Sequence, residues 1–366
     1  MKPVQKPLSR YNNRRQHASF QLAGCVPAVD RSSRHLHSMN TGRRQPVIPI
    51  VKTGFMQEAS MNRRNFLKYQ FQGMLWLAAG GSGLLLPKAS PAGSTPEISI
   101  VKGERAAATR AAVELLGGMQ RFVKPGNRVI IKPNMSFARP PAAGTNTSPE
   151  VVRELAIMCR EAGAASVLIP DNVLHMAEAS LEISGIRDAC ASVDPDMVRA
   201  ISSPHLYKEV VIPNAADIPR TDIMNVVLKS DVLIAAPTAK SHSSAGVSLS
   251  MKGMMGLIYD RGVFHGRYDL DTSIVDLCTL PKADLAVIDA SRVLSTGGPQ
   301  GPGKVIRENT VIASADMVAA DATAVSLFEW YGRRFKPSQV NHIRLAHKRG
   351  LGRMDIENLS TRRLSV

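Results

Sequence analysis

The chain has 366 residues, of which 44% are hydrophobic and 21% are charged, so it is a globular protein with one large or two modest domains. Its net charge of +16 would fit a nucleic-acid-binding protein, but residues 95–366 hold 32 basic and only 28 acidic residues. Aromatic residues make up 5% of the chain, which is few for base stacking, so we expect no nucleic-acid partner.

Residues 1–60 contain ten Lys and Arg residues, two acidic residues and no clear apolar periodicity. This composition predicts a disordered basic extension. Because an export signal follows it, the simplest interpretation is that translation begins at Met56 or Met61 and that 1–60 is not translated. A nucleic-acid-binding arm is the alternative.

Residues 61–68 (MNRRNFLK) resemble a twin-arginine export signal. The weakly apolar stretch 73–86 follows, and it is too short and too rich in glycine for a stable membrane span. Residues 88–92 (KASPA) suit cleavage by a signal peptidase. We therefore expect 61–94 to be a signal peptide that engages the twin-arginine translocation machinery and delivers a folded protein to a periplasmic or other extracytoplasmic compartment. A membrane-anchored or core helix is the alternative.

From residue 95 onward, short apolar runs alternate with amphipathic segments. The runs that we expect to form strands are 97–101, 128–132, 166–170, 209–212, 231–236 and 284–289. The segments that we expect to form helices are 104–121, 148–162, 178–191, 271–279, 316–331 and 338–349. Residues 304–306 and 310–313 flank a polar turn and predict a C-terminal hairpin. We predict an α/β domain over 95–366, with a mostly parallel central sheet flanked by helices and with a C-terminal hairpin and helices.

Unusual polar segments follow three of the predicted strands. In a parallel α/β sheet, ligands bind beyond the carboxyl ends of the strands, so these segments predict one composite site. The first, 132–134 (KPN), presents Lys132 and Asn134 from a backbone that proline makes rigid. Thr145 and Thr147 then precede the N-terminus of a predicted helix, which would suit an anion. A surface lysine and a capped helix without a ligand are the structural alternatives.

The second segment, 236–269, is rich in cationic and small residues. Lys240 would bind a phosphate or carboxylate, and His242 would be a general base or a metal ligand. Lys252, Arg261 and His265 add further positive charge. We predict Lys240, His242 and His265 as catalytic residues and Lys252 and Arg261 as ligand-binding residues.

The third segment follows Asp289 and includes 297–303 (GGPQGPG), whose prolines exclude a phosphate-binding glycine loop. We expect Asp289 and Gly301 to bind the ligand. Asp321, inside an Ala-rich predicted helix, joins His242 and His265 as a candidate metal ligand. The histidines are 23 residues apart, which matches no local zinc motif.

The four cysteines are widely spaced and form no CxxC motif, so no Cys-based zinc or iron–sulfur site can be derived from them. They are Cys25, Cys159, Cys190 and Cys278. We expect the last three to be buried as small apolar residues, with a disulfide as the alternative. The cofactor is therefore unknown. A metal or an iron–sulfur-type group stays an alternative, although the sequence contains no motif for either.

Several of these segments resemble the domain-of-unknown-function family 362. They are 131–134 (IKPN), 147–150 (TSPE), 230–242 (SDVLIAAPTAKSH), 251–253, 261, 265–266, 289, 298–303, 315–321 and 343–352. The resemblance covers roughly 98–360 and implies an α/β domain without a settled activity. Some members of the family carry ferredoxin-like segments, whose cysteines this chain lacks. Gly253 stands where the family more often has Asn.

These observations predict an exported enzyme or cofactor protein with a cationic Lys/His site for a small anionic ligand. Redox chemistry is the leading class, because of the export route and the family resemblance rather than any residue. A non-catalytic binding protein for an anionic ligand is the alternative.

Overall fold

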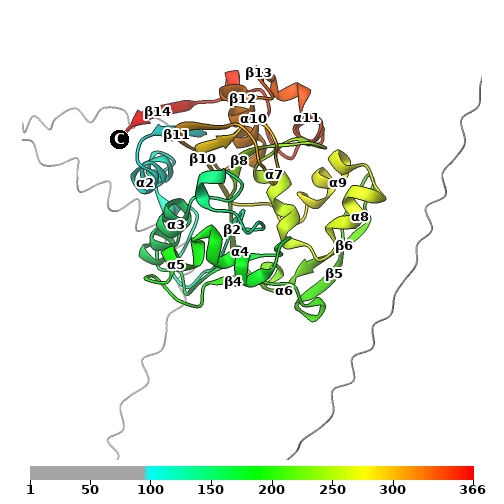
Figure 1. Ribbon diagram of the computed structural model, residues 1–366, viewed down its shortest axis with the longest axis horizontal. Helices are drawn as coiled ribbons and strands as arrows, with labels where there is room; N and C mark the ends of the chain where they lie inside the picture. The colour runs from blue at the N-terminus through cyan, green and yellow to red at the C-terminus, as the bar shows by residue number, and fades with distance from the viewer. Residues whose placement is uncertain (1–94, 96) are drawn as a thin grey trace, which may run out of the picture. The chain divides into compact units, whose positions relative to one another are not determined.

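The computed structural model describes residue 95 and residues 97–366 (Figure 1). The extension expected at 1–60 and the signal peptide expected at 61–94 lie outside these residues. No helix in the described part of the chain combines the length and hydropathy that a membrane crossing needs.

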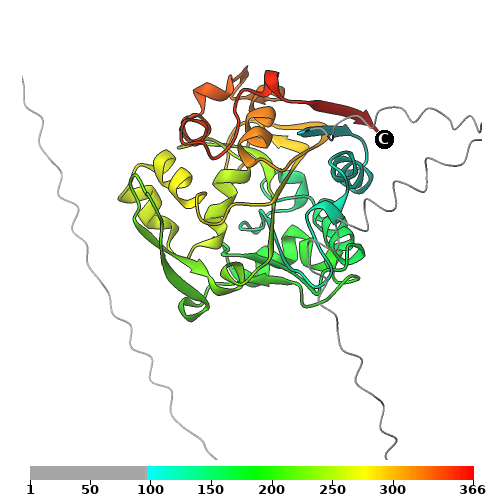
Figure 2. The same cartoon turned by 180° about the vertical axis from the view of Figure 1, so that it is seen from behind.

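The domain is built around a large, mostly parallel sheet. Its strands, in spatial order, are β14 (Thr361–Ser365), β1 (Ile98–Lys102), β11 (Val305–Ser314), β10 (Leu285–Leu294), β7 (Val232–Ala236), β2 (Arg128–Pro133), β3 (Ser166–Asp171) and β4 (Val198–Ala200). Among the strands of this order, only β11 is antiparallel to its neighbours and the rest are parallel. Both Figure 1 and Figure 2 show the red β14 at the edge beside β1. The predicted α/β class is confirmed.

Alternation of side chains along the strands builds two apolar cores. Val129 and Ile131 of β2 pack toward α2 (Arg105–Leu115), α3 (Pro149–Glu161) and α5 (Ile186–Cys190). Ile130, from the same strand, belongs to the opposite core. That core contains α7 (Ser250–Gly253), α9 (Leu270–Leu277), α10 (Met317–Leu327) and α11 (Asn341–Lys348). The sheet is therefore covered on both faces, as predicted.

The predicted helices are present, with differences at their ends. The segment 178–191 is divided into α4 (Ala177–Ser184) and α5, because Gly185 adopts a left-handed φ of 72° between them. The three cysteines in the described residues are buried and unpaired, as expected.

The hairpin predicted between 304–306 and 310–313 is wrong. Both segments lie in β11, which pairs antiparallel with β10. The polar residues between them do not turn the chain, because Asn309 adopts a φ of 45° and the register shifts between Ala290 and Arg292. A bulge thus absorbs the residues that resembled a turn. Short antiparallel pairs form elsewhere, at β5 (Tyr207–Val211) with β6 (Arg220–Met224) and at β12 (Glu329–Trp330) with β13 (Arg333–Arg334).

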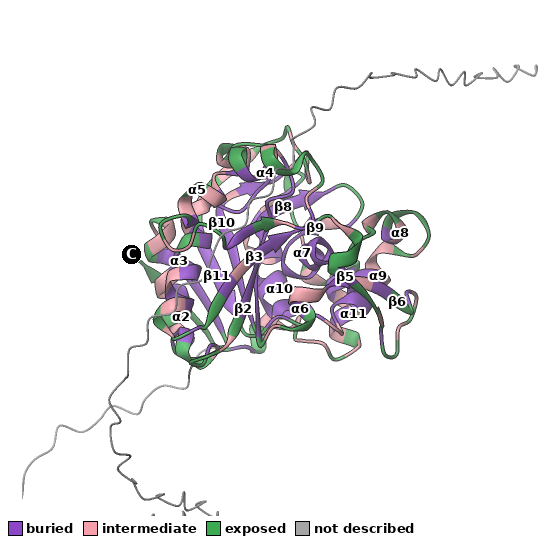
Figure 3. Cartoon of the chain, turned by 90° about the horizontal axis from the view of Figure 1, so that it is seen from below, coloured by how far each residue is buried: buried purple, intermediate pink, exposed green. Residues whose placement is uncertain are grey.

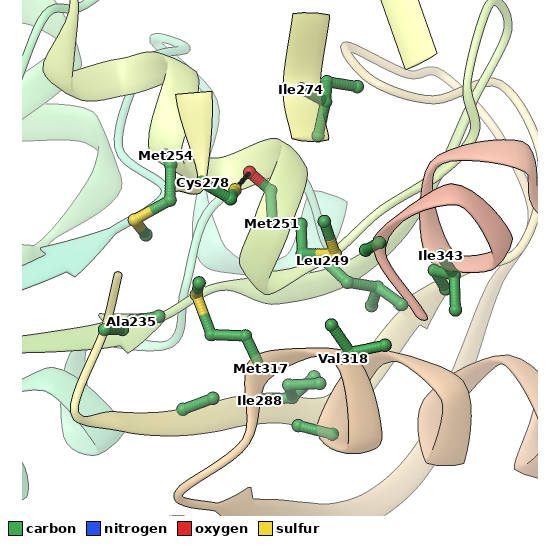
Figure 4. Close-up of a cluster of buried hydrophobic side chains, with 14 of the residues drawn as sticks. Ala235, Leu249, Met251, Met254, Ile274, Cys278, Ile288, Met317, Val318 and Ile343 are labelled. Carbon is green, nitrogen blue, oxygen red and sulfur yellow. Dashed lines mark hydrogen bonds between the residues drawn. The ribbon is translucent and has the colours of Figure 1, made fainter. Parts of the chain in front are cut away.

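The segment after β7, in which the sequence predicts no helix or strand, is largely regular structure. It forms β8 (Thr238–His242), β9 (Gly246–Ser248), α7 and α8 (Arg261–Gly266). β8 pairs with β10 and β9. Figure 4 shows Leu249 and Met251, at the start of α7, among buried side chains from β10, α9, α10 and α11. In Figure 3, α7 is buried, whereas α8 combines exposed residues with the buried Phe264.

Candidate functional site: a cationic cavity at the strand ends

A cavity of about 440 Å³ lies beyond the carboxyl ends of β2 and β3 and beside β8, α7 and α8. We call it the cationic cavity. The residues that line it are Lys132, Asn134, Ser136, Phe137, Asp171, Leu174, Lys240, His242, Ser243, Ser244, Ser248, Lys252, Gly253, Met255, Gly256, Arg261, Gly262, His265, Pro299 and Gln300. Seven residues predicted from the sequence are among them: Lys132, Asn134, Lys240, His242, Lys252, Arg261 and His265.

Lys132 forms a buried ion pair at the end of β2. Its Nζ lies 3.0 Å from Asp171 Oδ1, at the end of the neighbouring β3, and it also donates to the Pro133 carbonyl. Asp171 Oδ2 accepts hydrogen bonds from the Met135 amide and the Ser136 hydroxyl. Burial lowers the pKa of Lys132, and the Asp171 carboxylate opposes that shift. This pair fixes the floor of the cavity.

Asn134 connects three strand ends. Its side-chain oxygen accepts from the Thr238 amide at 3.0 Å, at the start of β8. The backbone amide of Asn134 donates to Thr147 Oγ1, and the Thr147 hydroxyl donates to the Ala236 carbonyl at the end of β7. Thr147 therefore acts behind the cavity wall and positions Asn134.

Lys240 projects from β8 and is only 3% exposed. Its Nζ donates to the Thr145 carbonyl at 2.6 Å and lies 5.0 Å from the centre of the Phe137 ring. Burial lowers the pKa of Lys240 to about 7, although Asp171 acts in the opposite direction. Thr145 itself is not among the lining residues, so its predicted role in ligand binding stays a prediction.

His242 presents a hydrogen-bond donor to the cavity. Its Nδ1 accepts from the backbone amides of Ser244 and Ala245, both at 3.2 Å, so the ring hydrogen of the neutral form is assigned to Nε2. Burial, then the charge of Lys252, lowers the pKa of His242 to about 3. At neutral pH the side chain is therefore an uncharged donor, and the general-base and metal-ligand roles expected from the sequence stay predictions.

Lys252 lies on α7 and is 8% exposed. Burial, followed by the charge of Arg261, lowers its pKa to about 7. The N-terminus of α7 is held by the buried Asp321, whose carboxylate accepts from the Ser250 amide at 2.8 Å and from the Met251 amide at 3.0 Å. Asp321 thus positions the helix that carries Lys252 and does not line the cavity.

The short helix α8 supplies Arg261 and His265. Asp260 begins this helix by accepting from the Gly262 and Val263 amides. The His265 ring stacks on that of His242, with 5.9 Å between ring centres. Burial lowers the pKa of both Arg261 and His265. Because its lining residues Gly262 and His265 are exposed, α8 forms the outer wall of the cavity.

Two more predicted ligand residues do not line the cavity. Asp289 accepts from the Ser148 amide, at the start of α3, and from the Ser291 amide of its own strand β10, so it stabilises the framework. Gly301 does not line the cavity, although Pro299 and Gln300 before it do. The three candidate metal ligands do not converge, because Asp321 is bonded to α7. Across residue 95 and residues 97–366, no group of three or more His, Cys, Asp or Glu side chains could hold a metal ion.

Sequence reasoning missed the one carboxylate of the cavity, Asp171. The predicted strand 166–170 ended one residue too early. Asp171 directly follows that apolar run, so the rule that selected Lys132 would also have selected Asp171. Phe137 and Leu174 were missed because isolated apolar residues in loops have no distinguishing pattern.

This chain is similar to known proteins in sequence and in structure. The chain is 24% identical over 234 residues to the thylakoid-associated protein sll1697 of Synechocystis sp., covering 62% of this chain and 71% of that protein. Among solved structures it is similar to the lactate racemase apoprotein from Thermoanaerobacterium thermosaccharolyticum, with a TM-score of 0.41 and 14% identity. That match covers 62% of this chain and 56% of the racemase, which is less than two thirds of its length.

The family model described as a domain of unknown function, DUF362, matches residues 129–326, which is more than half of the chain. The match includes every residue that lines the cationic cavity. The chain therefore belongs to the domain-of-unknown-function family 362.

Proposed function

We propose that this protein binds a small organic anion in the cationic cavity. The observation that carries the proposal is the charge of the lining: Lys132, Lys240, Lys252 and Arg261 line it, and Asp171 is the one acidic residue among the lining side chains. Desolvated cations without enough counter-charge are costly, and an anionic ligand would offset that cost.

The available donors favour an anion that is held from several sides. Lys132 is already paired with Asp171, whereas His242 offers a neutral hydrogen-bond donor. Arg261 offers a planar guanidinium, which can bind a carboxylate or phosphate through two parallel hydrogen bonds. Phe137, Leu174 and Met255 add apolar wall area, so an anion with a small carbon skeleton fits better than a bare inorganic ion.

Two classes of function are compatible with such a ligand. We favour an enzyme, because Lys240 and Lys252 have pKa values near 7 and so are suited to proton transfer or nucleophilic attack. The alternative is a non-catalytic binding protein for the same ligand. The redox chemistry expected from the sequence stays a prediction, since no cysteine is among the lining residues and no side chain there specifies it.

Calorimetry on the full chain tests anion binding, with oxalate, pyruvate and inorganic phosphate as probes. Arg261→Gln should weaken binding by about 10- to 100-fold, because it removes a charge-assisted contact. Arg267→Gln is the matched control, since Arg267 lies just beyond α8, is exposed and is not among the lining residues. Equal affinities in the two variants, or no binding of any probe, would overturn the proposal.

We further propose that the protein is exported in folded form through the twin-arginine route, on the basis of residues 61–68 and the small residues near Ala92. A variant in which both Arg63 and Arg64 are changed to Lys should stay in the cytoplasm of a bacterial host, while the parent chain reaches the periplasmic fraction. Equal distribution of the two forms between the fractions would contradict export by this route.

A further inference from the structure

The three lysines of the cationic cavity have different surroundings. Lys132 faces the Asp171 carboxylate, and Lys240 donates to the Thr145 carbonyl. Within the described residues, no ion pair or hydrogen bond engages the Lys252 ammonium, which is nevertheless almost completely buried. Lys252 is therefore the lysine whose amine is available to a ligand.

The helix that carries Lys252 is held rigidly. Two amides of its first turn donate to the buried Asp321, and Met251 packs against residues of α9 and α10, as Figure 4 shows. The thiol of Cys278, directly after α9, also donates to the Met251 carbonyl. A reactive group on a fixed element loses little conformational freedom when a bond to it forms.

Two side chains near Lys252 are suited to bind the carboxylate and the carbonyl oxygen of an oxo acid. Arg261 is close enough for its charge to lower the pKa of Lys252, and no ion-pair partner for it is found in residues 95 and 97–366. His242 presents an Nε2 hydrogen that can bond a carbonyl oxygen. An amine, a guanidinium and a neutral donor thus share a cavity of about 440 Å³.

We propose that Lys252 forms an imine with a small oxo acid whose carboxylate is bound by Arg261. This inference rests on the proposed anion-binding function, and it adds the chemical class of the ligand and a covalent step. The apolar residues Phe137, Leu174 and Met255 are available to the carbon chain of the acid.

The step balances without an added oxidant or reductant. The neutral Lys252 amine attacks the carbonyl carbon, which forms a C–N bond and a carbinolamine. The nitrogen gives up its two protons, the former carbonyl oxygen takes up two, the C–O bond breaks, and one water leaves. The net reaction is amine plus carbonyl giving imine plus water.

The pKa of Lys252, lowered to about 7 by burial and by Arg261, supports this role. An amine with an ordinary pKa near 10.4 is almost entirely protonated at neutral pH and cannot attack, whereas roughly half of the Lys252 side chains would be neutral at pH 7.

Borohydride trapping tests the imine. The full-length protein is incubated separately with pyruvate, 2-oxoglutarate and phenylpyruvate and then reduced with sodium borohydride. For at least one acid we expect an intact-mass increase equal to the oxo acid less one oxygen atom, and peptide mapping should place it on Lys252. Mapping the parent protein keeps the test valid even if a Lys252 variant fails to fold.

Controls separate specific from incidental labelling. Lys252→Arg should abolish the label, whereas Lys282→Arg, which alters an exposed lysine, should leave it unchanged. Acetone has a carbonyl but no carboxylate and should label Lys252 much less than the acids do. Oxalate has carboxylates but no ketone and should compete with labelling.

The outcomes distinguish this inference from the proposed function. Oxalate binding in the calorimeter without trapping of any oxo acid on Lys252 would overturn the imine and leave anion binding standing. Failure of both measurements would overturn both. Labelling of exposed lysines at the rate of Lys252 would also overturn the inference, because it would show that the cavity gives Lys252 no special reactivity.

Discussion

At the scale of single residues, the Lys132–Asp171 ion pair depends on the absence of a side chain at Gly256. A Cβ added there would contact Asp171 Oδ1 and the Lys132 side chain, with Nζ only 2.7 Å away. Gly256→Ala should therefore force the pair apart and destabilise the protein by about 1–3 kcal/mol, as overpacking does. Chemical denaturation measures the effect.

Gly253 provides the matched control for that variant. It also lines the cavity, but a Cβ there would meet only Pro237 Cβ, at an ordinary 3.8 Å. Gly253→Ala should leave stability unchanged or raise it slightly, because alanine favours a helix over glycine. Similar losses in both alanine variants would show that the ion pair is not what excludes a side chain at Gly256.

Lys252 should cost the protein stability. Its folded-state pKa of about 7 lies below its ordinary value, so the penalty is fully present below pH 7 and declines as pH rises toward the unfolded-state pKa. Lys252→Met should therefore stabilise the protein at pH 7, by about 1–4 kcal/mol if it behaves like other buried charges that are replaced by apolar residues.

The gain from Lys252→Met should shrink as the pH is raised from 7 to 8.5. Parallel urea titrations of the two proteins measure it. A variant less stable than the parent at pH 7 would mean that Lys252 has a stabilising partner.

At the scale of elements, α7 is a four-residue helix whose position depends on Asp321 of α10. Burial raises the pKa of Asp321 to about 6, although the two backbone hydrogen bonds, which favour the ionised carboxylate, act to lower it. Between its unfolded-state pKa near 4 and pH 6 the folded protein binds more protons, so the contribution of Asp321 to stability falls as pH rises.

Asp321→Asn removes this titration and keeps one acceptor for α7. We expect the parent's stability relative to the Asn variant to fall by up to about 3 kcal/mol between pH 4 and pH 6. His242, whose pKa is lowered to about 3, changes stability in the opposite direction, so the difference between the two proteins is the quantity to measure. A difference that is constant with pH would contradict a raised pKa at Asp321.

The elements that the sequence could predict are those whose pattern is apolar. β2, β7 and β10 are continuous apolar runs, and the sheet rule then places Lys132 and the segment after Ala236 at one edge. β8 could not be predicted, because its residues 238–242 (TAKSH) are mostly polar, yet all are buried, since they line the cavity or pair with β9 and β10. Polar burial of this kind depends on tertiary partners and leaves no periodic signal.

At the scale of the whole molecule, the cationic cavity combines residues from Lys132 to Gln300. Both apolar cores support it: Asn134 ends β2 and is held by Thr147, just before α3 on one side of the sheet, and α7 and α10 on the other side hold Lys252. The sequence indicated which charged groups to consider, but not which of them would be free. That distinction, between the bonded Lys240 and the unbonded Lys252, depends on backbone carbonyls that no side-chain pattern records.

Because the charge of the cavity depends on two lysines that titrate near neutrality, anion affinity should depend on pH. Lys240 and Lys252 have pKa values of about 7, so each loses its charge as pH rises through this range. Oxalate stays fully ionised from pH 6 to pH 8.5, so any change in its affinity comes from the protein. We expect its affinity to fall across this range, by at most about tenfold per pH unit for each lysine that must be protonated.

Lys240→Arg, whose guanidinium stays charged, should flatten part of that dependence when binding is measured by calorimetry. Affinity that is independent of pH in the parent protein would show that neither lysine contributes its charge to the ligand.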